Sequence, residues 1–260
     1  MTSLEQVYQA MKNSNPPGYT QDIVDIKQDV VEYWEERTES FAQLREAELQ
    51  SNKFARWEQE LLRHLPTGRS LRILDVGCGC GFFGIMLARH GHQVTGIDLT
   101  PTMVEQSRII AAKYGCQVEF QIMDAEQLSF ADATFDVVLS RNLTWTLPHP
   151  RAAYQEWCRV LVKGGILLNY DAEYAKYYAL RPAVEDNAHR DLPTGLTAKC
   201  RTIYDSLKIS SCSRPQWDLA ILAALGMHNT APDLSIRDAI YQEQDQFYIA
   251  APIFRIKAIK

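Results

Sequence analysis

Residues 71–84 read LRILDVGCGCGFFG, a composition suited to binding a nucleotide-like ligand. An apolar run reaches Asp75 and is followed by a loop with almost no side chains, so that backbone N–H groups can approach a ligand closely. Two glycine patterns overlap there: G-x-G-x-x-G from Gly79 to Gly84 is the dinucleotide fingerprint, and G-x-G-x-G from Gly77 to Gly81 follows an acidic residue. The second pattern puts Asp75 at the mouth of a strand instead of inside it, where an unpaired carboxylate is costly. It favours a cofactor that carries positive charge and no pyrophosphate.

Two further carboxylates end the next two apolar runs. Asp98 ends the run QVTGID, and Asp124, followed by Ala125, ends CQVEFQIMD. A carboxylate at the first position can accept both hydroxyls of a ribose, and one at the second can accept the exocyclic amine of an adenine. The alternatives are a helix cap for Asp98 and a turn former for Asp124.

The elements that must position these residues alternate between apolar strands and helical patterns. The sequence predicts an α/β fold that is Rossmann-like and doubly wound, with a mostly parallel seven-stranded sheet and an antiparallel C-terminal strand. The run FYIAAPIFRIKAI is expected to be a long strand that pairs with residues near 228–236. The expected strands before it cover 71–76, 93–98, 116–124, 135–140 and 165–170, and the expected helices between them cover 82–90, 100–114 and 150–161.

The segments outside this alternation predict the domain organisation. Residues 1–70 are expected to form an N-terminal helical cap segment, and residues 71–260 the main domain. Within that domain, residues 172–216 break the rhythm with Pro182, Pro193, Gly195 and Pro215, and are expected to be a helical insertion after strand five that caps the acceptor side.

The composition of the chain limits the classes of partner that we expect it to bind. The 260 residues carry a formal net charge of -5, and no clustered Lys/Arg face is apparent, which argues against a nucleic-acid partner. No run approaches the length of a membrane span, so a cytoplasmic protein without a membrane partner is expected. The six cysteines show neither a disulfide framework nor complete metal-ligand spacing, and no metal is expected. A homodimer is an open expectation.

The motifs together resemble those of class I S-adenosylmethionine-dependent methyltransferases of the small-molecule type. LDVGCGCGFFG resembles the first motif of the family, VTGIDLT the second and FQIMDAEQLSF the third, and the resemblance continues through FDVVLSRNLTW and RVLVKGGILL over about residues 71–171. It implies S-adenosyl-L-methionine as cofactor and S-adenosyl-L-homocysteine as product. The cofactor site that we expect comprises Trp34, Arg37, Asp75, Gly77, Cys78, Gly79, Asp98, Leu99, Met103, Asp124, Ala125 and Asn142.

The resemblance also implies a role for several of these residues. Gly77 and Gly79 would pack on the methionine part, Asp98 would bind the ribose hydroxyls, and Leu99 would lie beside the adenine that Asp124 and Ala125 recognise. Asn142 would lie near the sulfonium.

The segment YWEERTESF resembles the entry helix of small-molecule methyltransferases in this family. Trp34, Arg37 and Phe41 share one helical face by their spacing. In the functional interpretation Arg37 faces the cofactor carboxylate and Trp34 closes the pocket. The alternative is an amphipathic helix that only packs on the core.

The residues after strands four and five are candidates for binding the acceptor. Trp145 offers an aromatic wall, and Tyr170, Asp171 and Tyr174 combine aromatic rings with a carboxylate, a set that could bind a cationic amine or a phenolic acceptor. The alternative is a hydrophobic base under the insertion. His149 could be a general base, although a capping or surface role is favoured.

The leading hypothesis is therefore an enzyme that transfers a methyl group from S-adenosylmethionine to a small molecule. No catalytic residue is assigned, because the donor is already activated and positioning is the main requirement. The alternatives are an NAD-dependent oxidoreductase and a non-catalytic cofactor-binding module of the same fold. The sequence does not name the acceptor or the atom that is methylated.

Overall fold

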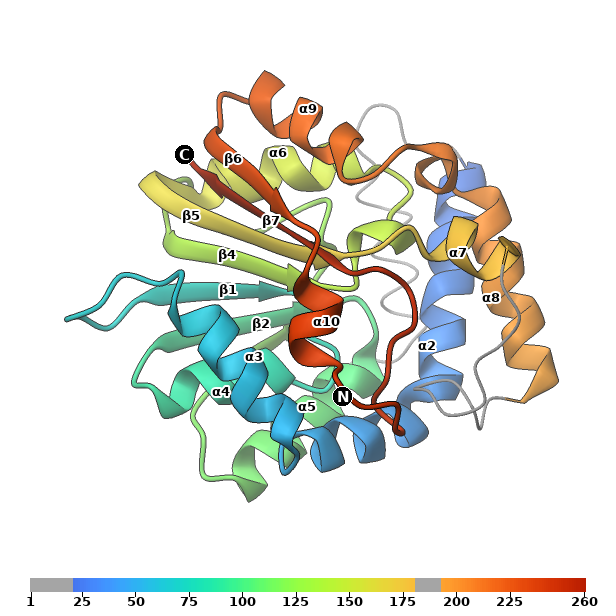
Figure 1. Cartoon of the computed structure of the whole chain (residues 1–260), viewed down its shortest axis with the longest axis horizontal. Coiled ribbons are helices and arrows are strands. Elements are labelled where there is room, and N and C mark those ends of the chain that lie inside the picture. The colour runs from blue at the N-terminus through green and yellow to red at the C-terminus, as the bar shows by residue number, and fades with distance from the viewer. Residues whose placement is uncertain (1–20, 181–192) are drawn as a thin grey trace.

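A computed structural model describes residues 21–180 and 193–260 of the chain. It contains one seven-stranded sheet in the order β3-β2-β1-β4-β5-β7-β6 (Figure 1). The first five strands run parallel to one another, and β7 runs antiparallel to both β5 and β6. The bounds are β1 Arg72–Val76, β2 Gln93–Asp98, β3 Glu119–Ile122, β4 Phe135–Arg141, β5 Leu161–Asp171, β6 His228–Asp233 and β7 Phe254–Ile259. The predicted fold class is confirmed.

The helices follow the predicted alternation. Helices α4, α5 and α6 each connect two parallel strands, and Pro101 and Pro150 begin α5 and α6 at the first turn, where a missing N–H is tolerated. The bounds are α2 Gln21–Glu48, α3 Asn52–Leu62, α4 Phe82–Arg89, α5 Pro101–Lys113, α6 Pro150–Val160, α7 Tyr174–Leu180, α8 Thr194–Ser206, α9 Gln216–Ala224 and α10 Ile236–Ile240. In this described part, no helix is both long and apolar enough to cross a membrane.

The C-terminal strand is shorter than predicted. Of the long expected strand, only Phe254–Ile259 is a strand, while residues 247–253 approach it as an irregular segment. Pro252 lies in that segment and lacks the N–H that a strand position needs. The expected hairpin partner near 228–236 is β6, and the short helix α10 follows it before the chain returns.

Alternation along the strands divides the core into two layers. Ile73 and Leu139 pack on one face of the sheet, and their neighbours Leu74 and Val138 pack on the other. Helices α3, α4 and α10 cover the first face, with α3 and α10 in front of the sheet in Figure 1, and α6 and α9 cover the second.

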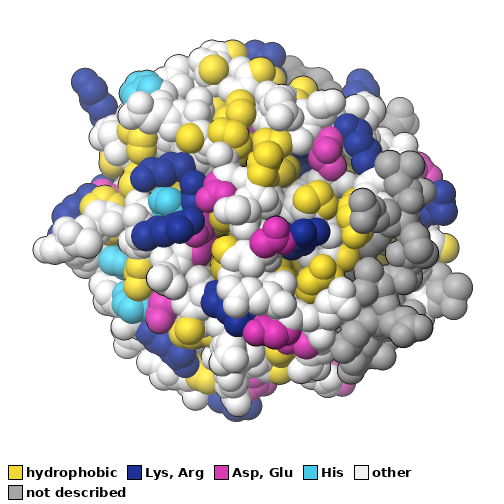
Figure 2. All heavy atoms as spheres, viewed as in Figure 1, with side chains coloured by type: hydrophobic (Ala, Val, Ile, Leu, Met, Phe, Trp, Pro, Cys, Tyr) yellow, Lys and Arg dark blue, Asp and Glu magenta, His cyan; other side chains and the backbone are white. Residues whose placement is uncertain are grey.

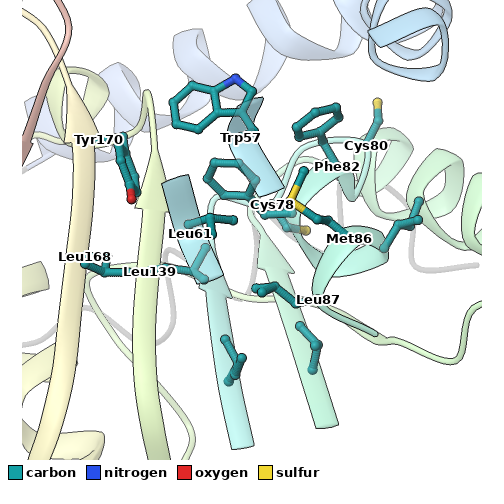
Figure 3. Close-up of a cluster of buried hydrophobic side chains, with 14 of the residues drawn as sticks. Trp57, Leu61, Cys78, Cys80, Phe82, Met86, Leu87, Leu139, Leu168 and Tyr170 are labelled. Atoms are coloured by element: carbon teal, nitrogen blue, oxygen red, sulfur yellow. The ribbon is translucent and has the colours of Figure 1, made fainter. Parts of the chain in front are cut away.

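Trp57 of α3 lies at the centre of the first layer (Figure 3). Its side chain is fully buried, and its ring packs edge-on against Phe83 and Tyr170, with centroids 5.2 Å away in both cases. Helix α3 is therefore part of the main core, although it precedes the first strand. The division into a cap at 1–70 and a domain at 71–260 stays a prediction.

Helices α2, α7 and α8 lie beyond the carboxyl ends of the parallel strands (Figure 1). Helix α2 packs against α5 on one side and α8 on the other. Ligands of open α/β sheets bind at this end of the strands, so these helices enclose the place where a site is expected.

Replacing Trp57 should test the contribution of α3 to the core. We expect Trp57→Ala to lower the free energy of unfolding by about 3–5 kcal/mol, because it removes a fully buried indole and leaves a cavity. Urea unfolding followed by circular dichroism measures this. Ile109→Ala is the control, because the Ile109 side chain is 50% exposed, and it should change stability by less than about 1 kcal/mol. Equal effects of the two substitutions would contradict the assignment of α3 to the core.

Candidate functional site

A cavity opens at the carboxyl ends of β1, β2 and β4, under α2, α7 and α8. All twelve residues predicted to bind the cofactor line it, as do Trp145 and Tyr174 from the predicted acceptor set. The fold therefore brings together predicted site residues that are up to 140 positions apart in the sequence, from Trp34 to Tyr174.

The glycine loop adopts the pattern that begins at Gly77. Strand β1 ends at Val76, and Gly77 and Gly79 follow with φ of 68° and 52°, the left-handed region that favours glycine. A Cβ on Gly77 would also meet the side chain of Leu143 at 2.8 Å. Gly84, the last glycine of the dinucleotide pattern, instead lies inside α4 without a positive φ.

Asp75 lies one residue before the end of β1, and only 2% of it is exposed. Burial raises the pKa of its carboxyl group from 3.8 to about 7, against the lowering effect of a hydrogen bond from the Gly84 backbone. Among the residues the structure describes, its Oδ2 atom has no hydrogen-bond partner. A buried acceptor in a cavity wall is suited to a cationic or hydrogen-bond-donating group of a ligand.

Asp98 holds the glycine loop in place through hydrogen bonds to its carboxylate. Its Oδ2 accepts the Gly79 N–H at 2.9 Å, and its Oδ1 accepts the Thr100 N–H at 2.9 Å. Burial raises the pKa of this carboxyl, and hydrogen bonds from the Thr100, Gly79 and Leu99 backbone and from the Thr100 side chain oppose that rise. A carboxylate in the cavity wall is a suitable acceptor for the hydroxyl donors of a ligand.

Asp124 is paired with a residue that the sequence analysis missed. Lys27 of α2 places its ammonium 2.5 Å from Asp124 Oδ2 and 2.7 Å from a carboxylate oxygen of Glu126. The other Asp124 oxygen accepts the Glu126 N–H at 2.9 Å. The N-terminal helix is thereby tied to the end of the sheet where the adenine was predicted to bind.

A detectable signal for Lys27 was present in the sequence. The residues of α2 that line the cavity recur every three or four positions: Lys27, Val30, Tyr33, Trp34, Arg37, Phe41 and Arg45. The predicted face of Trp34, Arg37 and Phe41 is the middle of this stripe, and continuing the helical spacing in both directions would have found the rest.

Three guanidinium groups line the cavity, from Arg37, Arg45 and Arg141. Arg141 is bonded to Glu48 at 3.0 Å and lies 4.6 Å from the centre of the Trp57 ring, and Arg45 also pairs with Glu48. In the described structure, the Nε donors of Arg45 and Arg141 lack a hydrogen-bond partner. This excess of buried positive charge is suited to the carboxylate of a ligand.

The other side of the cavity is aromatic. Trp145 packs against Tyr174 with ring centroids 5.4 Å apart and against Tyr204 of α8 at 4.8 Å. Asn142 holds this group together, because its carbonyl accepts the Trp145 indole N–H at 2.9 Å and its side-chain oxygen accepts the Tyr174 hydroxyl at 2.6 Å. Asn142 adopts a φ of 57°, a conformation that asparagine tolerates better than most residues and that is common at functional sites. Tyr204, far away in the sequence, was not predicted.

Tyr170 and Asp171 were predicted to contact the acceptor, and the structure places both outside the cavity. Strand β5 continues through Asp171, so the two side chains point to opposite faces of the sheet. Tyr170 is fully buried against Trp57 and donates a hydrogen bond to Glu60 at 3.2 Å. His149 also does not line the cavity, and its backbone N–H is bonded to Glu126 at 2.6 Å.

Asp171 belongs to a buried polar network that supports the aromatic wall. Its carboxylate accepts the Trp145 backbone N–H at 3.0 Å, the Thr144 hydroxyl and the Arg214 guanidinium at 3.0 Å. Arg214 also binds Asp218 at 2.8 Å, and the Asp171 and Asp218 side chains have no exposed surface. The short helix η1, Thr144–Thr146, is thus anchored to α9 through charges that water does not reach.

No group of metal-ligating residues was found in ranges 21–180 and 193–260. The chemistry available in this cavity is hydrogen bonding to hydroxyls and amines, charge pairing with a carboxylate and stacking on aromatic rings.

Part of the chain is similar to known proteins. Residues 73–165 match the model of a family described as a methyltransferase domain. The Ubiquinone biosynthesis O-methyltransferase of Xanthomonas axonopodis pv. citri is 37% identical over 97 residues, which are 37% of this chain and 41% of that protein. The chain thus matches less than half the length of this curated relative.

Solved structures show the same fold. YcgJ from Bacillus subtilis superposes with a TM-score of 0.54 at 19% identity, over 78% of this chain and 97% of that one. The cyclase SpnF does so with a TM-score of 0.54 at 23% identity, over 79% and 80% of the two chains. Residues 73–165 are therefore similar to a methyltransferase domain, and the solved structures share the fold of this chain. Since one structural neighbour is named a cyclase, the fold by itself does not decide the reaction.

The buried Asp75 carboxyl should make stability depend on pH. Because its pKa in the folded state lies near 7, the folded protein holds a proton that the unfolded chain releases above about pH 4. Its contribution to stability therefore falls as the pH rises from about 4 to about 7 and is constant above that. The substitution Asp75→Asn removes this titration. The free energy of unfolding of the ligand-free variant, relative to the wild type, should therefore rise by up to about 4 kcal/mol between pH 4.5 and pH 8. Urea unfolding of both proteins across this range measures the difference, and a difference that does not vary with pH would contradict the assignment.

The charged network around Arg214 should be costly to break. Arg214→Met leaves Asp171 and Asp218 buried without a cation, and we expect the free energy of unfolding to fall by about 3–5 kcal/mol. Arg159→Met is the matched control, since Arg159 pairs with Asp132 and Glu156 near the surface and should contribute about 0–1 kcal/mol. Chemical denaturation measures both, and a loss for Arg214→Met no larger than for Arg159→Met would show that the network does not stabilise the fold.

Proposed function

We propose that this protein transfers a methyl group from S-adenosylmethionine to a small-molecule acceptor and releases S-adenosylhomocysteine. One observation carries the proposal: a glycine loop, three carboxylates on successive strands and three arginines line the same cavity. An amine, a carboxylate, two ribose hydroxyls and an adenine are the groups that such a set can bind. The names of the relatives as methyltransferases support the same reaction.

The residues of the chain then take the following roles in the proposal. Asp98 accepts the ribose hydroxyls, and Asp75 and the backbone at Gly77 and Gly79 face the amino acid part of the cofactor. Arg37 contacts its carboxylate, with Arg45 and Arg141 close by. Cys78 and Met103 pack beside the loop, and Leu99, Asp124 and Ala125 surround the adenine.

Binding of an adenine beside Asp124 would alter the contacts of Lys27 in α2. Lys27 occupies the Asp124 carboxylate that would recognise the exocyclic amine, so the ammonium must share this carboxylate or shift toward Glu126. Because Lys27 contacts Glu126 as well, it can move without losing all of its charge pairing.

The chain needs to do little chemistry itself. The bound sulfonium supplies an activated methyl group, and an in-line approach of the acceptor displaces a neutral thioether. The chain has to orient the acceptor and exclude water, and α2, α7, α8 and η1 enclose the cavity for this purpose. We propose that, of the predicted cap at 1–70 and the predicted insertion at 172–216, helices α2, α7 and α8 form this enclosure. Residues 1–20 and 181–192 of these segments lie outside the described residues.

Basic and acidic side chains alternate in small groups on the face that Figure 2 shows, which agrees with a small acceptor and no nucleic acid. A cytoplasmic location and a homodimer stay predictions.

Binding of S-adenosylhomocysteine, measured by isothermal titration calorimetry, tests the proposal. We expect the protein to bind it and not NAD, and we expect Asp98→Ala to weaken binding by about 10- to 100-fold, because two charge-assisted hydrogen bonds are lost. Asp132→Ala is the control, since the Asp132 side chain is 77% exposed and lies outside the cavity, and it should leave the affinity unchanged.

Two results would support the alternatives. Binding of NAD without S-adenosylhomocysteine would indicate an oxidoreductase. Binding of S-adenosylhomocysteine with no methylated product across a broad panel of acceptors would indicate a non-catalytic module.

A further inference from the structure

The cavity has two halves that differ in charge. The carboxylates among its described lining residues are Asp75, Asp98 and Asp124, all at the ends of β1, β2 and β3. The opposite part, which we term the acceptor half, is lined by Tyr33, Trp34, Trp145, Tyr174, Cys200 and Tyr204. Within the described chain, the acceptor half has five aromatic rings and no carboxylate.

Four of the rings form two packed pairs. Tyr33 and Trp34 of α2 meet edge-on with centroids 5.2 Å apart. The rings of Trp145 and Tyr204 pack at 38° to each other. Flat apolar faces that are fixed in this way favour a planar ring as the guest, because stacking requires no reorganisation of the wall.

The structure also decides between the two acceptor classes that a tyrosine cluster beside a carboxylate allows. A cationic amine needs the Asp171 carboxylate, but Asp171 is fully buried and already bound by Arg214, Thr144 and Trp145. The charged side chain that does line this region is Arg37, whose guanidinium lies 5.9 Å from the centre of the Trp34 ring and 3.5 Å from the Tyr33 hydroxyl. A cation there would lose its hydration and find no described carboxylate to compensate its charge, since Arg37 is itself positive.

Polar groups that suit a hydroxyl are present instead. The Asn142 side-chain oxygen is occupied by Tyr174, which leaves the amide NH₂ as a donor at the edge of the acceptor half. Burial raises the pKa of Tyr33, so its hydroxyl remains protonated beside Cys200. The Asn142 amide is a neutral donor that can stabilise an oxygen that becomes negative.

We propose that the acceptor is a phenol: a planar aromatic ring whose hydroxyl oxygen receives the methyl group, and whose other substituents are neutral or anionic. This inference rests on the proposed function. In the step, the phenol oxygen forms a bond to the methyl carbon while the carbon–sulfur bond breaks and its electron pair stays on sulfur. The phenolic proton goes to water, so the products are an aryl methyl ether, a neutral thioether and a proton.

Three phenols whose para substituents are neutral, anionic and cationic test the proposal: 4-methylphenol, 4-hydroxyphenylacetate and tyramine, with benzylamine as an amine that lacks the hydroxyl. We titrate each into protein saturated with S-adenosylhomocysteine and follow the heat of binding and the quenching of tryptophan fluorescence. We expect the neutral and anionic phenols to bind at least tenfold more tightly than tyramine and benzylamine. With S-adenosylmethionine in place of the product, mass spectrometry should detect the methyl ether and no methylated amine.

Matched variants connect binding to the acceptor half. Trp145→Ala and Tyr204→Ala should lower the affinity for 4-methylphenol at least fivefold and change the affinity for S-adenosylhomocysteine less than twofold. Tyr114→Ala is the control, because Tyr114 is an aromatic residue that does not line this cavity, and it should change neither affinity.

The outcomes separate this inference from the proposed function. If the wild-type protein does not bind S-adenosylhomocysteine, the proposed function is wrong. If it binds S-adenosylhomocysteine but prefers benzylamine, or binds none of the phenols, the phenol assignment is wrong while methyl transfer stands. A preference for tyramine over the other two phenols would overturn the restriction to neutral or anionic substituents. Unchanged phenol affinity in both wall variants would likewise overturn the assignment of the acceptor half.

Discussion

The structure depends on charges that are buried at one end of a parallel sheet. Asp75, Asp98 and Asp124 lie at the carboxyl ends of three adjacent strands, and burial raises the pKa of each carboxyl group. Such groups weaken a fold unless they are paired. Two of them are partly satisfied by the loop and by Lys27, and Asp75 retains an oxygen without a described partner. Stability at this edge is therefore lower than an apolar edge would give, which is typical of a site that gains its remaining partners from a ligand.

The side chains that helix α2 places in the cavity are matched to these buried charges. A stripe of its residues, spaced by three or four, crosses the whole cavity and changes character along its length: Lys27 meets the carboxylates, Tyr33 and Trp34 join the aromatic wall, and Arg45 reaches the buried Glu48. One helix thus contributes to both halves of the cavity. Seven side chains of this helix line one continuous cavity.

The sequence predicted what is encoded locally and missed what depends on distant contacts. The glycine loop, the carboxylates that end β2 and β3 and the start of α5 at Pro101 are each specified by a few neighbouring residues. Tyr170 and Asp171 were misplaced because β5 extends through Asp171, and in a strand a single position decides which face a side chain takes. Tyr204 could not be found at all, since only the packing of α8 over η1 brings it to Trp145.

The network around Arg214 explains how the aromatic wall can be both exposed to a ligand and fixed. Trp145 lies on a turn of three residues, which has little rigidity of its own. Its backbone is held by Asp171, and Asp171 is held by an arginine that also binds Asp218 of α9. A buried ion pair adds little stability over an apolar core of the same shape, but its geometry is strict, because a displaced partner leaves a charge without compensation. The Asp171 carboxylate therefore determines where the Trp145 ring lies in the wall of the cavity.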